Sequence, residues 1–398
     1  MESQKESNEK EKILEQKSSK QSILDNIKSI YILSNILSLL KKNILLKLIQ
    51  HNKEKKKQLN INRNNYIEYR DIYTKIELEL ILIENGFGEI INPYNKTDEK
   101  YYHIYFDDDK EERRRTFLDT KEKAKRIKLI IDYQIKSFKN LFAQCNFLKS
   151  ISFKRLYRNN IDDISNMFMG CSSLKEIKFD IFNTDNVIDM SNMFRECSSL
   201  QKLDLCRFNT NKVTNMKEMF YDCRSLKEIN IPYFNINEVM NMNYMFFNCE
   251  SLEEIIFNNF DNKENIKPNI IDMSFMFIGC ASLKKAIFPN LNNNIFVNMS
   301  YMFCHCKSLK EVNFSNFKNV NVSEARAMFG TCSSLEELDI YKLNLSAAFD
   351  LSLMFNHCTS LKKLNITSYN KNGRTDIYGM FKGCSDKLKI NIKNELKI

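Results

Sequence analysis

The chain has 398 residues, of which 43 % are hydrophobic, and its 60 Lys and Arg against 50 Asp and Glu give a net charge of +10. This length suits two or three domains or one long array, whereas so mild a charge, without a continuous basic face interleaved with aromatic residues, argues against a nucleic-acid platform. The sequence has no run of 18 apolar residues and no apolar signal region within residues 1–20, so we expect neither a membrane span nor a signal peptide.

The segment before the array begins with two predicted parts. Residues 1–20 are charged and aperiodic, which predicts a disordered tail. Residues 21–65 carry apolar side chains at helical spacing with a polar break at 41–43, and this pattern predicts a small helical domain.

Residues 66–133 predict an N-terminal α+β cap. The aromatic and apolar residues from Tyr66 to Ile83 favour a helix, Tyr101 to Phe106 favour a strand, and the charged run from Asp107 to Arg115 favours a hairpin or loop. The apolar run from Ile127 to Ile131 falls about one repeat before the first strand of the array that follows. We therefore interpret it as the strand on which the array begins.

Residues 134–398 repeat one unit about ten times. Leu stands three residues after a recurring Cys, further apolar residues stand six and eight residues after it, and a Met-Phe pair usually precedes it by four and three residues. Self-similarity at a fixed period predicts a solenoid whose stacked coils share one core. The residue numbers of successive recurring cysteines differ by 26, except for one interval of 31: Cys145, Cys171, Cys197, Cys223, Cys249, Cys280, Cys306, Cys332, Cys358 and Cys384.

Each unit contains two local patterns. Apolar residues six and eight positions after the Cys predict a strand with one buried face. The segment before the Cys, as in Val187 to Phe194, has apolar residues at i, i+3, i+6 and i+7, which favours a short helix or 3₁₀ turn on the opposite side. The predicted fold class is an α/β solenoid with one parallel sheet and short helices opposite. The five extra residues within 261–268 are predicted to bulge as a loop without breaking the stack.

The unit Met-Phe-x-x-Cys-x-Ser-Leu-x-x-Leu/Ile-x-Leu/Phe-x-x-Phe is similar to the 26-residue repeats of BspA-like leucine-rich repeat proteins, which occur on bacterial surfaces and expand in protists. The resemblance covers roughly residues 135–395. It implies a right-handed leucine-rich repeat coil that serves as a binding or adhesion surface rather than an enzyme.

The cysteine array does not predict a metal site. Zinc needs four converging ligands, and a line of parallel side chains cannot supply them. His305 and His357 lie two coils apart, too far to share one ion. The cysteines are better interpreted as small buried side chains filling a turn. We predict no metal, no cofactor and no enzyme activity, because the sequence contains neither a catalytic constellation nor a glycine-rich phosphate loop.

The irregular, polar positions of the strand face are the candidate contacts for a partner, although a merely solvated face explains them equally well. Acidic pairs beside basic pairs, such as Glu253-Glu254 beside Lys284-Lys285, predict ion pairs between coils that contribute little stability. The candidate partner-binding residues stand seven, nine or ten positions after the Cys: Asp204, Arg207, Tyr233, Asn258, Asn290, Asn313, Asp339, Tyr341 and Lys342.

The N-terminal apolar segment from Ile30 to Leu40, followed by the one from Leu45 to Ile49, resembles an F-box. That resemblance implies docking on a cullin-ligase adaptor, for which the candidate residues are Ile32, Leu33, Ile36, Leu37 and Leu40. An alternative interpretation is a helical cap or helper domain.

Three functions follow from these patterns. The first is a non-enzymatic scaffold that binds a partner protein through the solenoid. The second is the substrate receptor of a cullin-type ubiquitin ligase, and the third is a cell-surface adhesin of the BspA type. We expect a monomer in the cytoplasm, whose cysteines stay reduced, with secretion by an unrecognised route left open.

Overall fold

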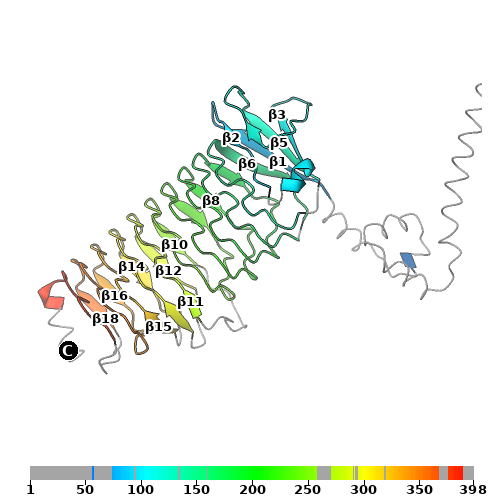
Figure 1. Ribbon diagram of the computed structural model, residues 1–398. Coiled ribbons are helices and arrows are strands. Elements are labelled where there is room, and N and C mark those ends of the chain that lie inside the picture. The colour runs from blue at the N-terminus through cyan, green and yellow to red at the C-terminus, as the bar shows by residue number, and fades with distance from the viewer. Residues whose placement is uncertain are drawn as a thin grey trace, which may run out of the picture. The chain divides into compact units, whose positions relative to one another are not determined.

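The computed structural model divides the chain into two compact units, Met1–Tyr73 and Thr74–Ile398. It describes residues 56–57, 74–93, 96–132, 135–158, 160–257, 270–289, 291, 295–317, 320–366 and 375–388. The predicted tail at 1–20 and nearly all of the helical domain at 21–65 lie outside the described residues. The second unit is the solenoid with its cap (Figure 1).

One face of the solenoid is a ladder of parallel strands, one from each coil. Its alternating burial follows the sequence pattern, because the central residue of each short strand points into the core. Nine strands bound about eight complete turns, fewer than the roughly ten repeats predicted. They are β6 (Leu148–Arg155), β7 (Glu176–Lys178), β8 (Lys202–Asp204), β9 (Glu228–Asn230), β10 (Glu254–Ile256), β12 (Lys285–Ile287), β14 (Glu311–Asn313), β16 (Glu337–Asp339) and β18 (Lys363–Asn365).

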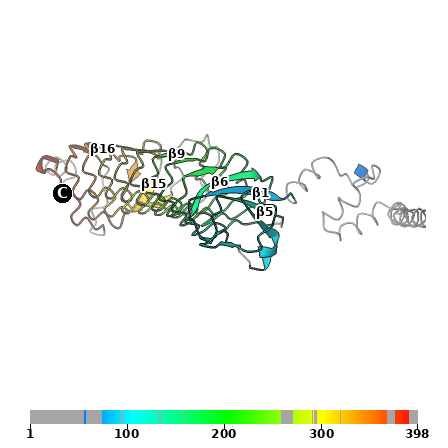
Figure 2. The ribbon, with the colours of Figure 1, turned by 90° about the horizontal axis from the view of Figure 1, so that it is seen from above.

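A second set of parallel strands forms another face of the coils. In the early coils this face consists of single bridges, which run from Ser137 through Asp163 to Asp272. In the later coils it widens into the sheet β11 (Ile270–Asp272), β13 (Phe296–Asn298), β15 (Val320–Glu324) and β17 (Leu343–Asn344). Viewed from above, the coils follow one another as similar loops (Figure 2).

The short helices expected before each cysteine are absent from the described coils, so the predicted α/β solenoid is a β-solenoid. The amide of Asn166 donates to Ser191 O at 2.9 Å in the next coil, whereas the intervening amide of Met167 donates back to Ile164 O. An α-helix would direct every such bond within its own segment. Residues in the left-handed conformation recur five positions and one position before each cysteine, as Asn192 (φ 54) and Glu196 (φ 62) do before Cys197. They prevent a continuous helix.

Helix among the described residues is confined to the 3₁₀ segment η1 (Lys96–Tyr101) and short stretches at 56–57 and 386–388. The described residues contain no helix long and apolar enough to cross a membrane.

The core is a continuous stack of the phenylalanines that stand three residues before each cysteine. Ten rings stack in sequence at centroid distances of 5.0–5.8 Å and interplanar angles of 5–14°. Phe246 and Phe277 flank the longer cysteine interval, and their centroids are 5.3 Å apart. The extra residues therefore leave the stack unbroken, as predicted. Residues 258–269, which contain them, lie outside the described part.

The N-terminal cap closes one end of the ladder by antiparallel pairing. β1 (Ile76–Leu82) pairs with β6 on one side and with β5 (Arg126–Ile131) on the other, and β5 pairs with β3 (Tyr102–Phe106). An antiparallel strand of this kind covers the edge that β6 would otherwise expose. A small sheet of β2 (Gly88–Glu89) and β4 (Phe117–Leu118) completes the cap.

Two predictions for the cap are wrong. Residues 76–82 form a strand rather than part of a helix, because Ile76, Leu78, Leu80 and Leu82 alternate with Glu77, Glu79 and Ile81 at the period of a strand. β5 does not begin the array either, since β1 lies between it and β6. The predicted strand at Tyr101 to Phe106 and the loop that follows it are confirmed.

Candidate binding surface

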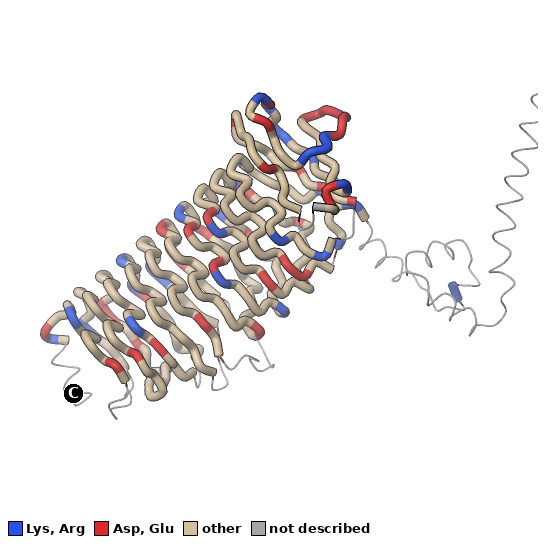
Figure 3. Tube along the Cα trace, viewed as in Figure 1, with Lys and Arg blue, Asp and Glu red and all other residues tan. Residues whose placement is uncertain are grey.

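The strand face presents charged side chains that pair along the solenoid. Lys284 Nζ lies 2.5 Å from Glu253 Oε2, and Lys362 Nζ lies 2.7 Å from Glu336 Oε2, which confirms the predicted inter-coil pairing. Each lysine lowers the pKa of its glutamate partner through the side-chain hydrogen bond. Such exposed pairs contribute little to stability. Acidic and basic residues are interspersed along the coils (Figure 3), so this face carries little net charge for long-range steering.

Three of the candidate contact residues stabilise the turn that follows their own strand. A side-chain oxygen of Asp204, Asn313 or Asp339 accepts a hydrogen bond from the backbone N–H two residues further on, at 3.0, 2.8 and 3.0 Å. Sequence reasoning treated these residues as contacts, yet an Asx turn gives each a structural role as well. Asp204 Oδ1 also accepts a 2.9 Å hydrogen bond from Asn230 Nδ2.

The other candidates on this face are more available. Tyr233 is 60 % exposed and Tyr341 is 57 % exposed, and the Lys342 ammonium lies 5.9 Å from the Tyr341 ring centroid. Arg207 is exposed. Neither Arg207 nor Tyr233 forms an ion pair or a side-chain hydrogen bond within the part that the structure describes.

The structure separates these residues into two groups. Asp204, Arg207 and Tyr233 belong to the coils of β8 and β9, whereas Asp339, Tyr341 and Lys342 belong to the coil of β16. Asn313 stands apart on β14. The candidates Asn258 and Asn290, and the adaptor-docking residues Ile32, Leu33, Ile36, Leu37 and Leu40, lie outside the described residues.

The ladder has an opening between β9 and β10 that sequence reasoning missed, and its lining ends at Pro232, next to Tyr233. β9 pairs with β8 and β10 pairs with β12, but no backbone hydrogen bond joins β9 to β10 in the described coils. The ladder is also interrupted between β7 and β8 and between β14 and β16, where the strands stay closer together. β9 and β10 together line a cavity of about 530 Å³. The cysteine spacing across this opening is the same as in most other coils, so the repeat pattern carries no signal of it.

The backbone around the opening has unpaired polar groups facing the cavity. Leu205 N donates to Asn230 O at 2.9 Å and Glu228 N donates to Gln201 O, so these groups of β9 point towards β8. Peptide groups alternate in direction along a strand, which turns those of Ile229 towards β10. By the same reasoning the backbone groups of Glu254 and Ile256 point towards β9, because those of Glu253 and Phe257 bond the β12 coil.

The side chains around the opening are apolar, acidic and basic, since Lys227 lines the cavity together with three glutamates and Ile256. Ile256 is 43 % exposed. Glu228 pairs with Lys202 at 2.8 Å and Glu253 pairs with Lys284, whereas Glu254 forms no ion pair with any described residue. The opening therefore offers hydrogen-bonding backbone, an apolar patch, the Glu254 carboxylate without an ion-pair partner among the described residues, and the Lys227 ammonium.

A row of aromatic residues lies on the turn side of the coils. The rings of Tyr221 and Phe247 stack at 4.5 Å, and those of Tyr244, Phe275 and Tyr301 stack at 4.5 and 4.9 Å. All five are partly exposed. The Arg195 guanidinium covers the Tyr221 ring at 4.1 Å, and Arg326 Nε donates to Tyr301 Oη at 2.9 Å. The row thus finds its partners within the solenoid.

The recurring cysteines link successive coils. From Cys171 to Cys384, each thiol donates to the carbonyl of the phenylalanine three residues before the preceding cysteine, with Sγ···O distances of 3.0–3.2 Å. Burial raises the pKa of the recurring thiols from Cys171 to Cys358, to about 12 for Cys358. Within the described residues, no group of three or more metal-binding side chains exists. A protonated thiol that donates to a carbonyl is a structural element rather than a reactive one.

Alkylation of the native protein should therefore modify Cys206 far faster than any other cysteine. Cys206 is the one thiol of the twelve that is not buried, although a hydrogen bond to Asp204 raises its pKa and slows its reaction. Mass spectrometry after brief iodoacetamide treatment measures the modified positions, and urea should make all twelve react. A Cys206→Ser variant should lose the fast reaction. Rapid native labelling at the recurring positions would contradict the hydrogen-bonded arrangement.

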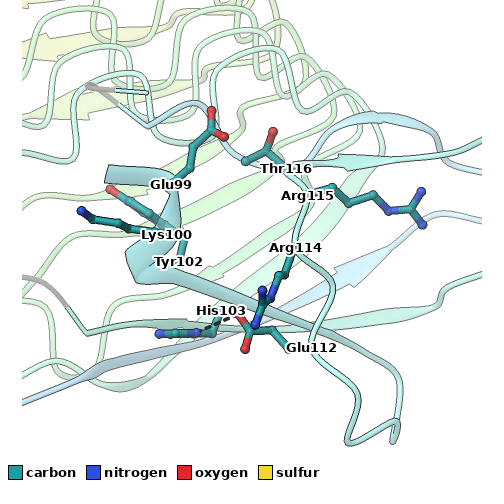
Figure 4. Close-up of a pocket in the computed structure, with 8 residues that line it drawn as sticks. All are labelled: Glu99, Lys100, Tyr102, His103, Glu112, Arg114, Arg115 and Thr116. Atoms are coloured by element: carbon teal, nitrogen blue, oxygen red, sulfur yellow. Dashed lines mark hydrogen bonds and ion pairs between the residues drawn. The ribbon is translucent and has the colours of Figure 1, made fainter. Parts of the chain in front are cut away.

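The cap contains a second cavity, of about 480 Å³. His103 Nδ1 lies 2.9 Å from Glu112 Oε1, and His103 Nε2 lies 3.1 Å from Asp132 Oδ2. Figure 4 places Glu112 and Arg114 beside His103, whereas the Arg115 guanidinium extends away from them and pairs with Glu122. The charges around this cavity mostly neutralise one another. The residues that line this cavity are Glu99, Lys100, Tyr102, His103, Glu112, Arg114, Arg115 and Thr116. None of them is a cysteine or serine that could act as a nucleophile.

The cap should lose stability as pH rises through the pKa of His103. Burial alone would lower this pKa, but hydrogen bonds and charge attraction from Glu112 and Asp132 outweigh it, so the folded-state pKa is raised. The stabilisation is then complete below the unfolded-state value of about 6.5 and disappears above the raised folded-state value. Hydrogen exchange of the β3 and β5 amides between pH 5 and 8 measures the effect. A His103→Gln variant should show a flatter profile, and an identical profile would assign the pH dependence elsewhere.

The coils match a known family of repeat proteins. A family model described as "Mycoplasma protein of unknown function, DUF285" matches residues 136–260 and 271–394, well over half of the chain. No curated protein matches the chain.

Two solved structures are distantly similar to this chain. A leucine-rich repeat protein from Bacteroides ovatus has 18 % identity over 67 % of this chain and 83 % of that one, with a TM-score of 0.21. A chain of the TLR13–ssRNA13 complex has 19 % identity over 56 % of this chain and 30 % of that one, with a TM-score of 0.30. The family match on both sides of the longer cysteine interval, rather than these likenesses, shows that the chain belongs to the DUF285 family, whose repeats are of the leucine-rich type.

Proposed function

We propose that this protein is a non-enzymatic scaffold that binds a partner protein through the strand face of its solenoid. The opening between β9 and β10, together with the exposed side chains of Arg207 and Tyr233 on the turns that follow β8 and β9, is the observation that carries the proposal. A stacked core holds these side chains on a regular ladder, so little conformational entropy is lost when a partner binds. Tyr and Arg are also the residue types that most often dominate binding energy at protein interfaces.

The scaffold proposal is tested by comparing two surface variants of the full chain as bait for partner proteins from the native cell. One variant carries Arg207→Ala, Tyr233→Ala and Tyr341→Ala on the strand face, and the matched control carries Phe349→Ala and Tyr378→Ala, which are 71 % and 75 % exposed elsewhere. Proteins retained by the wild type and the control, but lost by the strand-face variant, support the proposal. A partner retained equally by all three baits would contradict it.

A second candidate function is the substrate receptor of a cullin-type ubiquitin ligase. It is supported by the F-box-like residues between Ile30 and Ile49. A charge-introducing pair of substitutions, Leu33→Glu and Leu37→Glu, should abolish capture of a cullin adaptor by the full chain while leaving strand-face binding intact. No adaptor bound by the wild type would exclude this function.

The place of this protein in the cell is proposed on the same basis. A scaffold with twelve free thiols is suited to the reducing cytoplasm. A BspA-type adhesin at the cell surface is the remaining alternative. Glycans at sequons such as Asn298 and Asn321 in protein isolated from its own cell would favour the adhesin over the cytoplasmic scaffold.

A further inference from the structure

We propose that the opening between β9 and β10 binds an extended peptide segment that pairs its backbone with the facing strand edges and places a basic side chain at Glu254. This inference rests on the proposed scaffold function and specifies its partner. The two edges face a cavity of about 530 Å³, which is within the usual range of roughly 300–1,000 Å³ for binding pockets.

The backbone supplies the first part of the recognition. Ile229 turns its N–H and C=O towards the cavity from β9, and Glu254 and Ile256 turn theirs towards it from β10. A peptide in β conformation presents N–H and C=O groups on both of its sides, so it can complete the ladder that the coils leave open. A buried ladder of this kind favours residues that keep their backbone N–H, and proline at a pairing position would prevent it.

The side chains supply the second part. Glu254 projects from the face of β10 without an ion-pair partner in the described part of the chain, whereas Glu228 and Glu253 are each paired with a lysine. A lysine or arginine of the bound peptide would neutralise Glu254. Ile256, two residues further along the same strand face and 43 % exposed, would contact an apolar peptide side chain two positions from the basic one.

The turn side explains why the opening persists. Opposite β9 and β10 the coils remain bonded to each other, for example from Phe220 N to Met245 O and from Phe246 N to Met276 O, both at 2.8 Å. The Phe220 and Phe246 rings stack at 5.0 Å, the shortest separation in the core stack. The coils are therefore joined on the turn side and, just before the strands, by Ser251 N donating to Arg224 O at 3.2 Å, whereas β9 and β10 themselves stay unpaired.

The test uses the full chain and a fluorescein-labelled peptide, acetyl-Lys-Val-Lys-Thr-Lys-Val-amide, in fluorescence anisotropy. A peptide of about six residues covers the three-residue edges with one residue or more to spare at each end. Two control peptides have the same length. One is N-methylated at alternate residues, which removes backbone donors, and the other carries Glu in place of Lys. We expect saturable binding of the lysine peptide, and a loss of about tenfold for the N-methylated one, which corresponds to one or two hydrogen bonds.

Protein variants locate the site. Glu254→Lys should weaken the lysine peptide about fivefold to tenfold and strengthen the glutamate peptide, because it reverses one charge at the opening. Glu176→Lys is the matched control, since Glu176 occupies the same repeat position on β7, and it should bind like the wild type. Circular dichroism shows that both variants are folded, which is expected for substitutions at exposed positions.

Three results would overturn the proposal: no binding of the lysine peptide, equal binding of its N-methylated form, or equal weakening by Glu254→Lys and Glu176→Lys. The last would mean that only general electrostatic attraction is at work. If the lysine peptide does not bind but the strand-face triple variant still loses its partner protein, the scaffold function stands and this inference fails. If the peptide binds as expected but the triple variant keeps every partner, the scaffold assignment fails instead.

Discussion

Replacing Phe220 by Ala should lower the free energy of unfolding of the solenoid by about 3–5 kcal/mol, because it removes a ring from the middle of a close-packed stack. Phe220 is fully buried, and its ring centroid lies 5.5 Å from that of Phe194 and 5.0 Å from that of Phe246. The rings on both sides belong to separate coils held by their own backbone bonds, so they cannot collapse fully into the space. Urea denaturation with linear extrapolation measures the change.

Phe349→Ala is the matched control for this substitution. The same side chain is removed, but Phe349 is 71 % exposed, so the free energy of unfolding should change by no more than about 0.5 kcal/mol. Each coil contacts only its neighbours, and hydrogen exchange should therefore accelerate most in the coils next to Phe220 and least in the cap. Equal costs for the two substitutions would show that the phenylalanine stack does not determine stability.

Residue spacing predicted which side chains are buried far better than it predicted backbone conformation. Met193, Phe194 and Cys197 are fully buried, as their positions in the repeat required. The same spacing suggested a helix, because apolar residues at i, i+3, i+6 and i+7 share one side of a helix. A succession of turns places them on one side as well. What decides between the two is the left-handed conformation of residues such as Asn192 and Glu196, and Glu carries no strong signal for it.

The opening on the strand face illustrates a different limit. β8 pairs with β9 although both follow the same sequence rule as β9 and β10, which do not pair. Local pattern determines that a strand forms and which of its residues are buried. Whether two neighbouring strands reach hydrogen-bonding distance depends on how several coils pack together. A candidate site made by such a separation is therefore visible only in the structure.

An asparagine that stands twelve residues after the recurring cysteine stabilises the turn after the strand, as Asn209 shows. Asn209 Oδ1 accepts from Asn211 N at 3.0 Å, and Asn209 Nδ2 donates to Asp185 in the preceding coil. The neighbouring threonines were overlooked, although Thr184 and Thr210 are among the few polar residues that are fully buried. Two threonines separated by one full repeat were the available signal, because repetition at the coil period places side chains in register.

Thr210→Val should cost about 2–4 kcal/mol of unfolding free energy, although valine has almost the same shape as threonine. The Thr210 hydroxyl donates to Asn235 O at 2.8 Å and accepts from Asn235 N at 2.7 Å, while the residue is only 1 % exposed. Valine would leave both backbone groups of Asn235 without their partner, and each unsatisfied buried group costs about 1–3 kcal/mol. Thermal or urea unfolding measures the loss.

Thr210→Ser separates the hydroxyl from the methyl group. Serine keeps both hydrogen bonds and loses one buried methyl, so it should cost only about 1 kcal/mol. The predicted order of stability is therefore wild type, Ser, Val, whereas apolar burial alone would give Val, wild type, Ser. Valine at least as stable as serine would mean that water reaches Asn235 in this turn, and that the coils are held together by their apolar stack without help from the threonine bridge.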